Sequence, residues 1–326
     1  MLPVTYQDIE AALPRVHAVL QPTPLIQWPG LSQQLDCAIY VKHENHQPVG
    51  AFKVRGGVNL ASTLTDQERT EGLLGVSTGN HGQSLAFAAR HVACPCTIVV
   101  PANGNQDKNR AMRQLGADLI EHGRDFEEAR EHLEQLLETH GGRYVHSANE
   151  PLLIAGVGSM AWEIFARLPE PDVILVPIGL GSGVCGTCIV AKHRRPETKV
   201  IGVQAANASS VARSWASGKL ESDERIDTWA EGLATRVPAE MTLEIMRELM
   251  DDVILVEEDE MRAAAFELLR QTHNLAEGAG AATLAAATQQ KDRFRGQRVV
   301  AILSGGNLDL TELPRILAAG EGLSNR

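Results

Sequence analysis

An uninterrupted apolar run that leads directly into a glycine-rich turn constrains this chain more than any other feature. Residues 172–178 read DVILVPI, and residues 179–186 read GLGSGVCG. A run without polar alternation is typical of a parallel strand buried on both faces. Glycines let the backbone approach a ligand closely, and a helix that begins after the turn offers free N–H groups and a positive dipole end to a phosphate. The stretch predicts a buried strand, an anion site and a helix.

The rest of the chain repeats the alternation of strand and helix. The expected strands include 37–42, 172–178, 199–204 and 299–303 and one that ends at 75–77, and the expected helices include 85–91, 108–115, 125–140 and 261–272. The stretch QPTPLIQWPG, residues 21–30, contains several prolines and is expected to be a loop. We find no internal repeat. This alternation is typical of an α/β protein with mostly parallel sheets.

Composition excludes several classes of partner. A net charge of −11 over 326 residues argues against nucleic acid, because such binders need clustered Lys and Arg. No apolar run approaches the roughly 20 residues of a membrane span, and the N-terminus lacks the basic and apolar regions of a secretory signal. Five cysteines, an odd number, do not indicate a disulfide framework. We therefore expect a cytoplasmic protein with reduced thiols and no nucleic-acid or membrane partner.

Two familiar motifs are present only in weak form. Residues 181–186 fit G-x-G-x-x-G after a strand, but the acidic residue expected at the end of the next strand falls near Gln204, which is neutral. A dinucleotide site is therefore disfavoured. The spacings Cys185-x-x-Cys188 and Cys94-x-Cys96 do not form the paired CxxC pattern of a zinc site, so buried structural thiols are expected.

Other polar turns follow expected strands. The turn STGNHG, residues 77–82, lies between a strand and an alanine-rich helix, where backbone N–H groups can bind an anion. The segment SGGN begins at Ser304 and puts a hydroxyl where α/β proteins bind ligands, at the carboxyl edge of a sheet. Glu277 is expected between an apolar strand end and a run of small residues.

Lys53 lies in GAFKVRGG, residues 50–57, between a small apolar approach and a glycine pair. Burial there would lower the pKa of its amine, which is what a lysine needs to form a Schiff base with a carbonyl. By itself, the residue is more typical of a surface lysine in a turn, because buried lysines are rare.

Taken together, these motifs resemble the fold-type II pyridoxal-phosphate enzymes, in the threonine dehydratase and serine racemase branch. GAFKVRGG, STGNHGQ, the glycine loop after LVPI, AEGAG and LSGGN occur in the family's order across residues 50–307. The resemblance implies an α/β fold of two open, mostly parallel twisted sheets with flanking helices, like the tryptophan synthase β subunit. It also implies a large cofactor-binding domain from residues 1–62 and 151–326, and a small mobile domain on the substrate side from residues 63–150.

The resemblance implies a role for each site residue. Lys53 would form the Schiff base with pyridoxal 5'-phosphate, and Lys53 and Thr78 are the candidate catalytic residues. The expected cofactor contacts are Phe52 beside the cofactor, Asn80 at the ring hydroxyl, the phosphate cradle of Gly179, Leu180, Gly181, Ser182 and Gly183, Glu277 near the ring, and Ser304 at the pyridine nitrogen. The expected substrate-carboxylate residues are Ser77, Thr78, Asn80 and His81.

The implied activity is that of an ammonia-lyase. It would convert a small amino-acid substrate such as L-threonine or L-serine to a 2-oxo acid and ammonia, in a homodimer or homotetramer. Three alternatives stay open: a dehydratase for 3-hydroxyaspartate or another β-hydroxy amino acid, an amino-acid racemase, and a non-catalytic protein that binds a small molecule.

The sequence departs from the family pattern at several positions. Val49 and Ala51 replace hydroxyl residues before the lysine, and Leu180 and Ser182 interrupt the tetraglycine run. Thr78 stands where the racemases have a serine base; it is stiffer at χ1, which favours elimination over racemisation.

A regulatory domain and a metal site are not expected. Relatives controlled by isoleucine carry a C-terminal extension, and without one beyond residue 326 we expect no such inhibition. The positions that hold a divalent cation in many relatives are Gln204, Ala208 and Ser210 here. Because hard cations prefer carboxylate oxygens, we expect no magnesium or calcium there.

Overall fold

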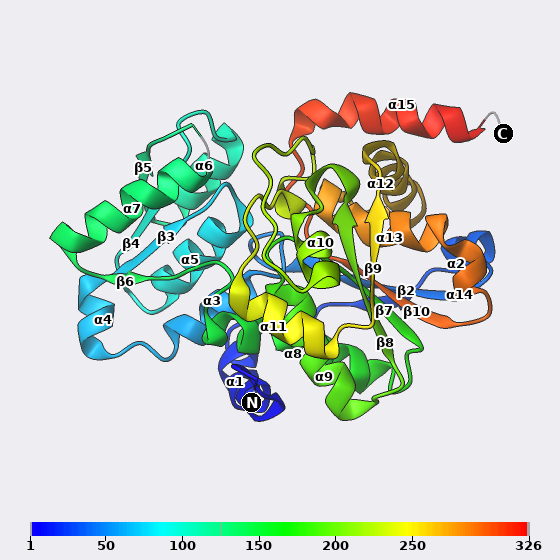
Figure 1. Ribbon diagram of the computed structural model, residues 1–326, viewed down its shortest axis with the longest axis horizontal. Coiled ribbons are helices and arrows are strands. Elements are labelled where there is room, and N and C mark those ends of the chain that lie inside the picture. Colours follow the sequence, from blue (N-terminus) through cyan, green and yellow to red (C-terminus); the bar gives the residue numbers. More distant parts are fainter. Residues whose placement is uncertain (1, 125, 325–326) are drawn as a thin grey trace.

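The described part of the chain forms two β-sheets with helices on their faces (Figure 1). The computed structural model describes residues 2–124 and 126–324. The strands are β1 (Leu25–Gln27), β2 (Ala38–His43), β3 (Leu73–Val76), β4 (Cys96–Val100), β5 (Asp118–Glu121), β6 (Arg143–Tyr144), β7 (Val173–Pro177), β8 (Lys199–Ala205), β9 (Asp252–Val256) and β10 (Arg298–Leu303).

Helices connect most of these strands. They are α1 (Tyr6–His17), α2 (Pro29–Leu35), α3 (Val54–Ala61), α4 (Asp66–Glu71), α5 (Asn80–His91), α6 (Gln106–Gln114), α7 (Phe126–His140), α8 (Pro151–Arg167), α9 (Ser182–Arg194), α10 (Ser210–Ser217), α11 (Glu240–Leu249), α12 (Glu258–Thr272), α13 (Gly278–Gln289), α14 (Lys291–Phe294) and α15 (Leu313–Ser324). Single 3₁₀ turns are η1 (Glu44–His46), η2 (Ala206–Ala208), η3 (Glu231–Leu233) and η4 (Leu310–Glu312). Among the described helices, none has the length and apolar character needed to cross a membrane.

The larger sheet has six strands in the order β1-β2-β10-β7-β8-β9. All neighbours in it are parallel except β1, which pairs antiparallel to β2. Alternate side chains of its strands enter two different cores. Leu175 and Ala301 pack with α12 and α13 on one face, whereas Val176 and Ile302 pack with α8 and α9 on the other. Burial on both faces explains why β7 and β10 are continuous apolar runs.

The smaller sheet has four parallel strands in the order β5-β4-β3-β6. Ile98 packs against α5 on one face, and Val99 packs against Ala129 and Leu133 of α7 on the other. Figure 1 shows this sheet with its helices beside the six-stranded sheet, and α15 along one edge of the molecule. Helix α3 contacts both α5 and α8, so it lies between the two sheet systems.

The expected fold class, α/β with two mostly parallel sheets and flanking helices, is confirmed. The domain boundaries at 62/63 and 150/151, and the mobility of the smaller domain, stay predictions. The helix expected over 125–140 is α7, and its first expected residue, Asp125, lies outside the described residues.

Two local expectations were wrong. The proline-flanked segment at 25–27 was expected to be a loop, but it forms β1 through antiparallel pairing with β2. Glu277 does not follow a strand; it is the N-cap of α13, since the small residues after it form a buried helix.

Candidate active site

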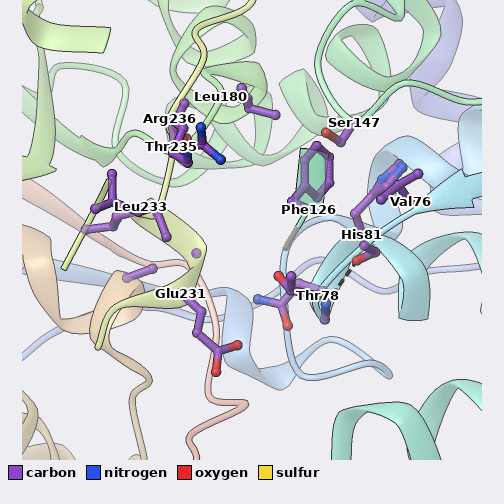
Figure 2. Close-up of a pocket in the computed structure, with 18 of the residues that line it drawn as sticks. Val76, Thr78, His81, Phe126, Ser147, Leu180, Glu231, Leu233, Thr235 and Arg236 are labelled. Carbon is purple, nitrogen blue, oxygen red and sulfur yellow. Dashed lines mark hydrogen bonds between the residues drawn. The ribbon is translucent and has the colours of Figure 1, made fainter. Parts of the chain in front are cut away.

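A cavity of about 640 Å³ lies between the two sheet systems. Figure 2 shows Thr78 and His81 on one side of it and Leu180 and Thr235 on the other. Every site residue expected from the sequence lines this cavity: Phe52, Lys53, Ser77, Thr78, Asn80, His81, Gly179, Leu180, Gly181, Ser182, Gly183, Glu277 and Ser304. The structure therefore brings together residues from five separate segments, while the role of each stays a prediction.

Lys53 immediately precedes α3 and its amine faces the glycine loop. The Nζ atom donates to the Ser182 hydroxyl at 2.9 Å and to the Ser147 carbonyl at 3.3 Å. Burial lowers the pKa of this amine from 10.5 to about 8. The backbone of the segment is tied to the end of β10, because the Phe52 N–H donates to the Ser304 carbonyl at 3.0 Å. A held amine with a lowered pKa is suited to attack a carbonyl.

The glycine loop joins β7 to α9 and leaves an open helix N-terminus. Gly181 is the N-cap, with φ of 102°, a left-handed conformation that favours glycine, and no side chain caps the helix. A Cβ on Gly183 would lie 3.1 Å from the Phe52 ring, and one on Gly179 would lie 2.4 Å from the Gly232 carbonyl oxygen. The first-turn N–H groups therefore remain open to a phosphate beside Lys53. This cradle and the adjacent amine fit pyridoxal 5'-phosphate.

Asn80 and Glu277 meet across the cavity. The Asn80 Nδ2 atom donates to the Glu277 carboxylate at 2.7 Å. Burial raises the pKa of Glu277, and the charge of Lys108 and the hydrogen bond from Asn80 oppose that rise. Ser304, at the end of β10, is buried in the lining of the same cavity. A hydroxyl, an amide and a carboxyl group thus surround the space next to Lys53.

The turn between β3 and α5 uses part of its polar capacity internally. The Ser77 hydroxyl accepts from the N–H groups of Gly79 and Gly82 at 3.0 and 2.8 Å, so it stabilises the start of α5. Thr78 is exposed to the cavity.

The buried His81 ring is neutral. Its Nε2 atom lies 3.1 Å from the Val145 carbonyl. A carbonyl can only accept, so Nε2 carries the proton. Burial, with a smaller contribution from the charge of Lys53, lowers the pKa of His81 to about 3. His81 therefore adds no positive charge to the cavity near neutral pH.

Several lining residues were missed from the sequence. Lys108 of α6 forms an ion pair with Glu231 of η3 at 2.5 Å, from opposite sides of the cavity. Ser147 accepts from Lys53 through its backbone carbonyl, and Phe126 lines the cavity from the start of α7. No sequence motif marks these positions, because their proximity depends on how the two sheet systems pack.

The positions expected to lack a metal hold neutral groups. The side-chain amide oxygen of Gln204 accepts from the Ala212 N–H at 2.9 Å, and the Ser210 hydroxyl donates to the Thr235 backbone carbonyl at 2.7 Å. These neutral groups do not fit a hard divalent cation. Across residues 2–124 and 126–324, no cluster of three or more His, Cys, Asp or Glu side chains is arranged to hold a metal. The absence of a metal stays a prediction.

The cysteines do not form a reactive centre in the structure. Cys185 and Cys188 are fully buried in α9, and Cys94 and Cys96 are buried near the start of β4. Burial raises the pKa of the Cys96 thiol to about 12 and those of Cys185 and Cys188 further still. Thiols held in this neutral form are poor nucleophiles and poor metal ligands.

Comparison with known proteins places the chain in one enzyme family. The family model for "Pyridoxal-phosphate dependent enzyme" matches residues 16–305. The chain is 37% identical over 323 residues to the L-threonine ammonia-lyase of Thermotoga maritima, covering 99% of this chain and 80% of that protein. It is 33% identical over 317 residues to the catabolic L-threonine dehydratase TdcB of Escherichia coli K12, covering 97% and 96%.

Solved structures agree in fold. The processed form of threonine deaminase isoform 2 from Solanum lycopersicum matches with a TM-score of 0.92 and 31% identity, over 98% of this chain and 92% of that one. Serine racemase from Dictyostelium discoideum matches with a TM-score of 0.87 and 33% identity, over 94% and 99%. The chain belongs to the pyridoxal-phosphate dependent enzymes of fold type II, in the threonine dehydratase family.

Proposed function

We propose that this chain releases ammonia from L-threonine or L-serine and leaves a 2-oxo acid, with Lys53 as the residue that binds pyridoxal 5'-phosphate. The observation that carries the proposal is the amine of Lys53, which has a pKa lowered to about 8 and lies 2.9 Å from the hydroxyl of Ser182 in the glycine loop. L-threonine ammonia-lyases and dehydratases at 33% to 37% identity over nearly the full chain support this class of activity.

The residues around Lys53 divide into a phosphate side and a ring side. Gly179, Leu180, Gly181, Ser182 and Gly183 would bind the phosphate through backbone N–H groups at the start of α9. On the ring side, Asn80 would donate to the ring oxygen, Ser304 would face the pyridine nitrogen, and Phe52 and Glu277 would pack beside the ring. A neutral serine opposite the nitrogen does not enforce ring protonation, which suits elimination better than transamination.

When bound, pyridoxal phosphate acts as an electron sink that makes the Cα proton of an amino acid acidic. The amine of Lys53 then accepts that proton, and its lowered pKa keeps part of it in the neutral form near pH 7. Thr78, Asn80 and His81 would orient the substrate carboxylate, with Ser77 holding their turn in place. Departure of the β-hydroxyl as water and hydrolysis of the released enamine give the 2-oxo acid and ammonia.

Amino-acid racemisation is the second candidate, because a serine racemase shares the fold at 33% identity. The exposed hydroxyl of Thr78 lines the cavity and is the group that would serve as a second base. Its branched side chain is restricted at χ1, which makes it the weaker candidate for that role.

A substrate screen tests the proposal. Ammonia release is measured with both enantiomers of threonine, serine, 3-hydroxyaspartate and a bulkier β-hydroxy amino acid. We expect ammonia and a 2-oxo acid from an L-enantiomer, with threonine or serine turned over fastest. Inversion at Cα without ammonia would instead identify a racemase, and no change in any substrate would contradict both activities.

We also propose a cytoplasmic location and a homodimeric or homotetrameric assembly. All five cysteines are free and buried, which supports a reducing compartment. Leu310 and Leu317 are exposed apolar side chains of the kind that subunit contacts cover. Light scattering of the purified protein measures the number of subunits.

A further inference from the structure

Asn307 forms a hydrogen-bonded relay that ends at the proposed cofactor ligand Asn80. Its Nδ2 atom donates to the Val49 carbonyl at 2.8 Å and to the Asn80 Oδ1 atom at 2.7 Å. The Asn80 Nδ2 atom in turn donates to the Glu277 carboxylate at 2.7 Å. The relay therefore runs from a backbone carbonyl, through two amide side chains, to a carboxylate.

The chemistry of the two ends fixes the direction of the relay. A backbone carbonyl can only accept, so the atom of Asn307 that faces Val49 must be its nitrogen. That nitrogen requires an acceptor on Asn80, and the amide of Asn80 must present its oxygen there. A flipped Asn80 would set nitrogen against nitrogen at Asn307 and would lose the hydrogen bond that its nitrogen donates to Glu277. Both ends thus select one orientation of the Asn80 amide.

This orientation determines what Asn80 offers to the cavity. An amide nitrogen carries two N–H groups, and Glu277 accepts from one of them. Among the described residues, the second N–H of Asn80 has no hydrogen-bond partner, and Asn80 lines the cavity. A flipped amide would present an acceptor in its place. The relay therefore keeps a donor available where the ring oxygen of the cofactor is proposed to bind.

Asn307 itself is held firmly. The Gly306 N–H donates to the Gly50 carbonyl at 2.9 Å, so the segment after β10 lies beside residues 50–53, which lead to Lys53. Gly50 has φ of 69°, and a Cβ there would lie 2.5 Å from the Asn307 Oδ1 atom, so the loop packs directly on this amide. Within the described residues, Asn307 is not part of the cavity lining, so it acts on a ligand only through Asn80.

We propose that Asn307 is a positioning residue that fixes the amide of Asn80 as a hydrogen-bond donor toward pyridoxal phosphate. The inference rests on the proposed role of Asn80. Asn80 begins α5 beside the smaller sheet, whereas Asn307 follows β10 of the larger sheet, so the donor is oriented only when both parts are packed together.

The test is the variant Asn307→Asp, which keeps the shape of the side chain but removes both N–H groups. Full-length holoenzyme is stripped of cofactor and titrated with pyridoxal 5'-phosphate. We expect the dissociation constant to rise about tenfold, which corresponds to about 1.4 kcal/mol. The visible absorption maximum should shift, and the rise in unfolding temperature on adding the cofactor should shrink relative to wild type. Neither signal requires turnover.

The matched control is Asn274→Asp. Asn274 is also half-buried, donates to a backbone carbonyl, that of Thr272, at 2.6 Å, and accepts from Asn45 at 2.9 Å, but it does not line the cavity. This variant should lose stability without the cofactor while keeping wild-type affinity and absorption. Equal weakening of cofactor binding in Asn274→Asp and Asn307→Asp would overturn the inference, because the effect would then reflect general stability.

Two further variants keep the test decisive. If Asn307→Asp does not fold, the smaller Asn307→Ser is used, with the same expected direction. Asn80→Ala separates the two levels of the argument: impaired binding in Asn80→Ala together with wild-type binding in the Asn307 variants would overturn the positioning inference alone. Wild-type cofactor binding and absorption in Asn80→Ala would overturn the proposed role of Asn80, and the inference with it.

Discussion

The guanidinium of Arg55 donates two hydrogen bonds to the carboxylate of Glu163, at 2.6 and 2.8 Å, with both side chains buried. Glu44 accepts from the same guanidinium at 2.7 and 2.8 Å, and Lys42 donates to Glu163 at 2.6 Å. Arg55 follows Lys53 by two residues in the chain. The cluster therefore anchors the first turn of α3, directly after the reactive lysine, to α8 and to the end of β2.

Replacing Glu163 by Gln should destabilise the protein by about 3–5 kcal/mol, because it leaves two buried cations, Lys42 and Arg55, with Glu44 as their remaining carboxylate partner. Although burial opposes ionisation of Glu163, the charges and hydrogen bonds of Arg55 and Lys42 outweigh it and lower the pKa of the carboxyl to about 2. Urea unfolding measures the loss. The control is Glu170→Gln, which breaks an exposed pair with Arg298 and should cost less than about 1 kcal/mol. Similar losses in both variants would contradict the prediction.

Replacing Lys53 by Ala should abolish both lyase activity and the visible absorbance of the bound cofactor. The reason is that no other amine among the described lining residues is positioned against the glycine loop as the Lys53 Nζ atom is. Ammonia release and an absorption spectrum measure the two losses. Lys199→Ala, at an exposed lysine on β8, serves as the control and should behave as wild type. Undiminished turnover in Lys53→Ala would contradict the mechanism.

The rate at which cofactor-free protein captures pyridoxal phosphate should depend on pH. Only the neutral amine attacks a carbonyl, and burial lowers the pKa of Lys53 to about 8. The rate constant should therefore rise as the pH increases from 6, reach half its limit near pH 8, and level off above pH 9. Stopped-flow absorbance measures it at constant ionic strength. A midpoint near 10.5, the ordinary value for lysine, would show that Lys53 is solvated in the cofactor-free protein.

Chelation of divalent cations should leave the activity unchanged. The side chains of Gln204 and Ser210 are neutral. The Gln204 amide oxygen already accepts from the Ala212 N–H, and the Ser210 hydroxyl already donates to the Thr235 carbonyl. Ammonia release is compared with and without a chelator, and again after magnesium is restored. In the same samples, magnesium should leave the unfolding temperature unaltered. A large loss of activity that magnesium reverses would reveal a cation site elsewhere in the protein.

The sequence predicts those parts of the fold whose signal is local. The apolar run at 173–177 and the glycine turn after it are contiguous, so β7, the loop and the start of α9 could be recognised directly. Strand β1 could not, because its three residues become a strand only by pairing with β2. Glu277 was misjudged for a related reason: alanine and glycine at 278–282 are compatible with either a turn or a buried helix until their packing is known.

The candidate site also contains residues that the sequence predicts and residues that it does not. Lys53, Asn80 and Ser304 lie in ordered motifs, and the structure brings all three to the cavity. The partners that hold them were not predictable. Asn307 contacts Asn80 from 227 positions away, and Lys108 contacts Glu231 from 123 positions away. Such contacts depend on how the two sheets pack, a non-local property that no single motif encodes.

The order of strands in the larger sheet also affects how the protein folds during translation. Strand β10 lies between β2 and β7, although it is the last strand to be translated. The four strands of the smaller sheet come from one continuous stretch of the chain. Because domains generally fold as units during synthesis, this sheet can form before translation is complete. Until β10 leaves the ribosome, β2 and β7 of the larger sheet have no strand to pair with between them. A nascent chain that stalls before residue 298 would therefore expose two unpaired strand edges to chaperones and proteases.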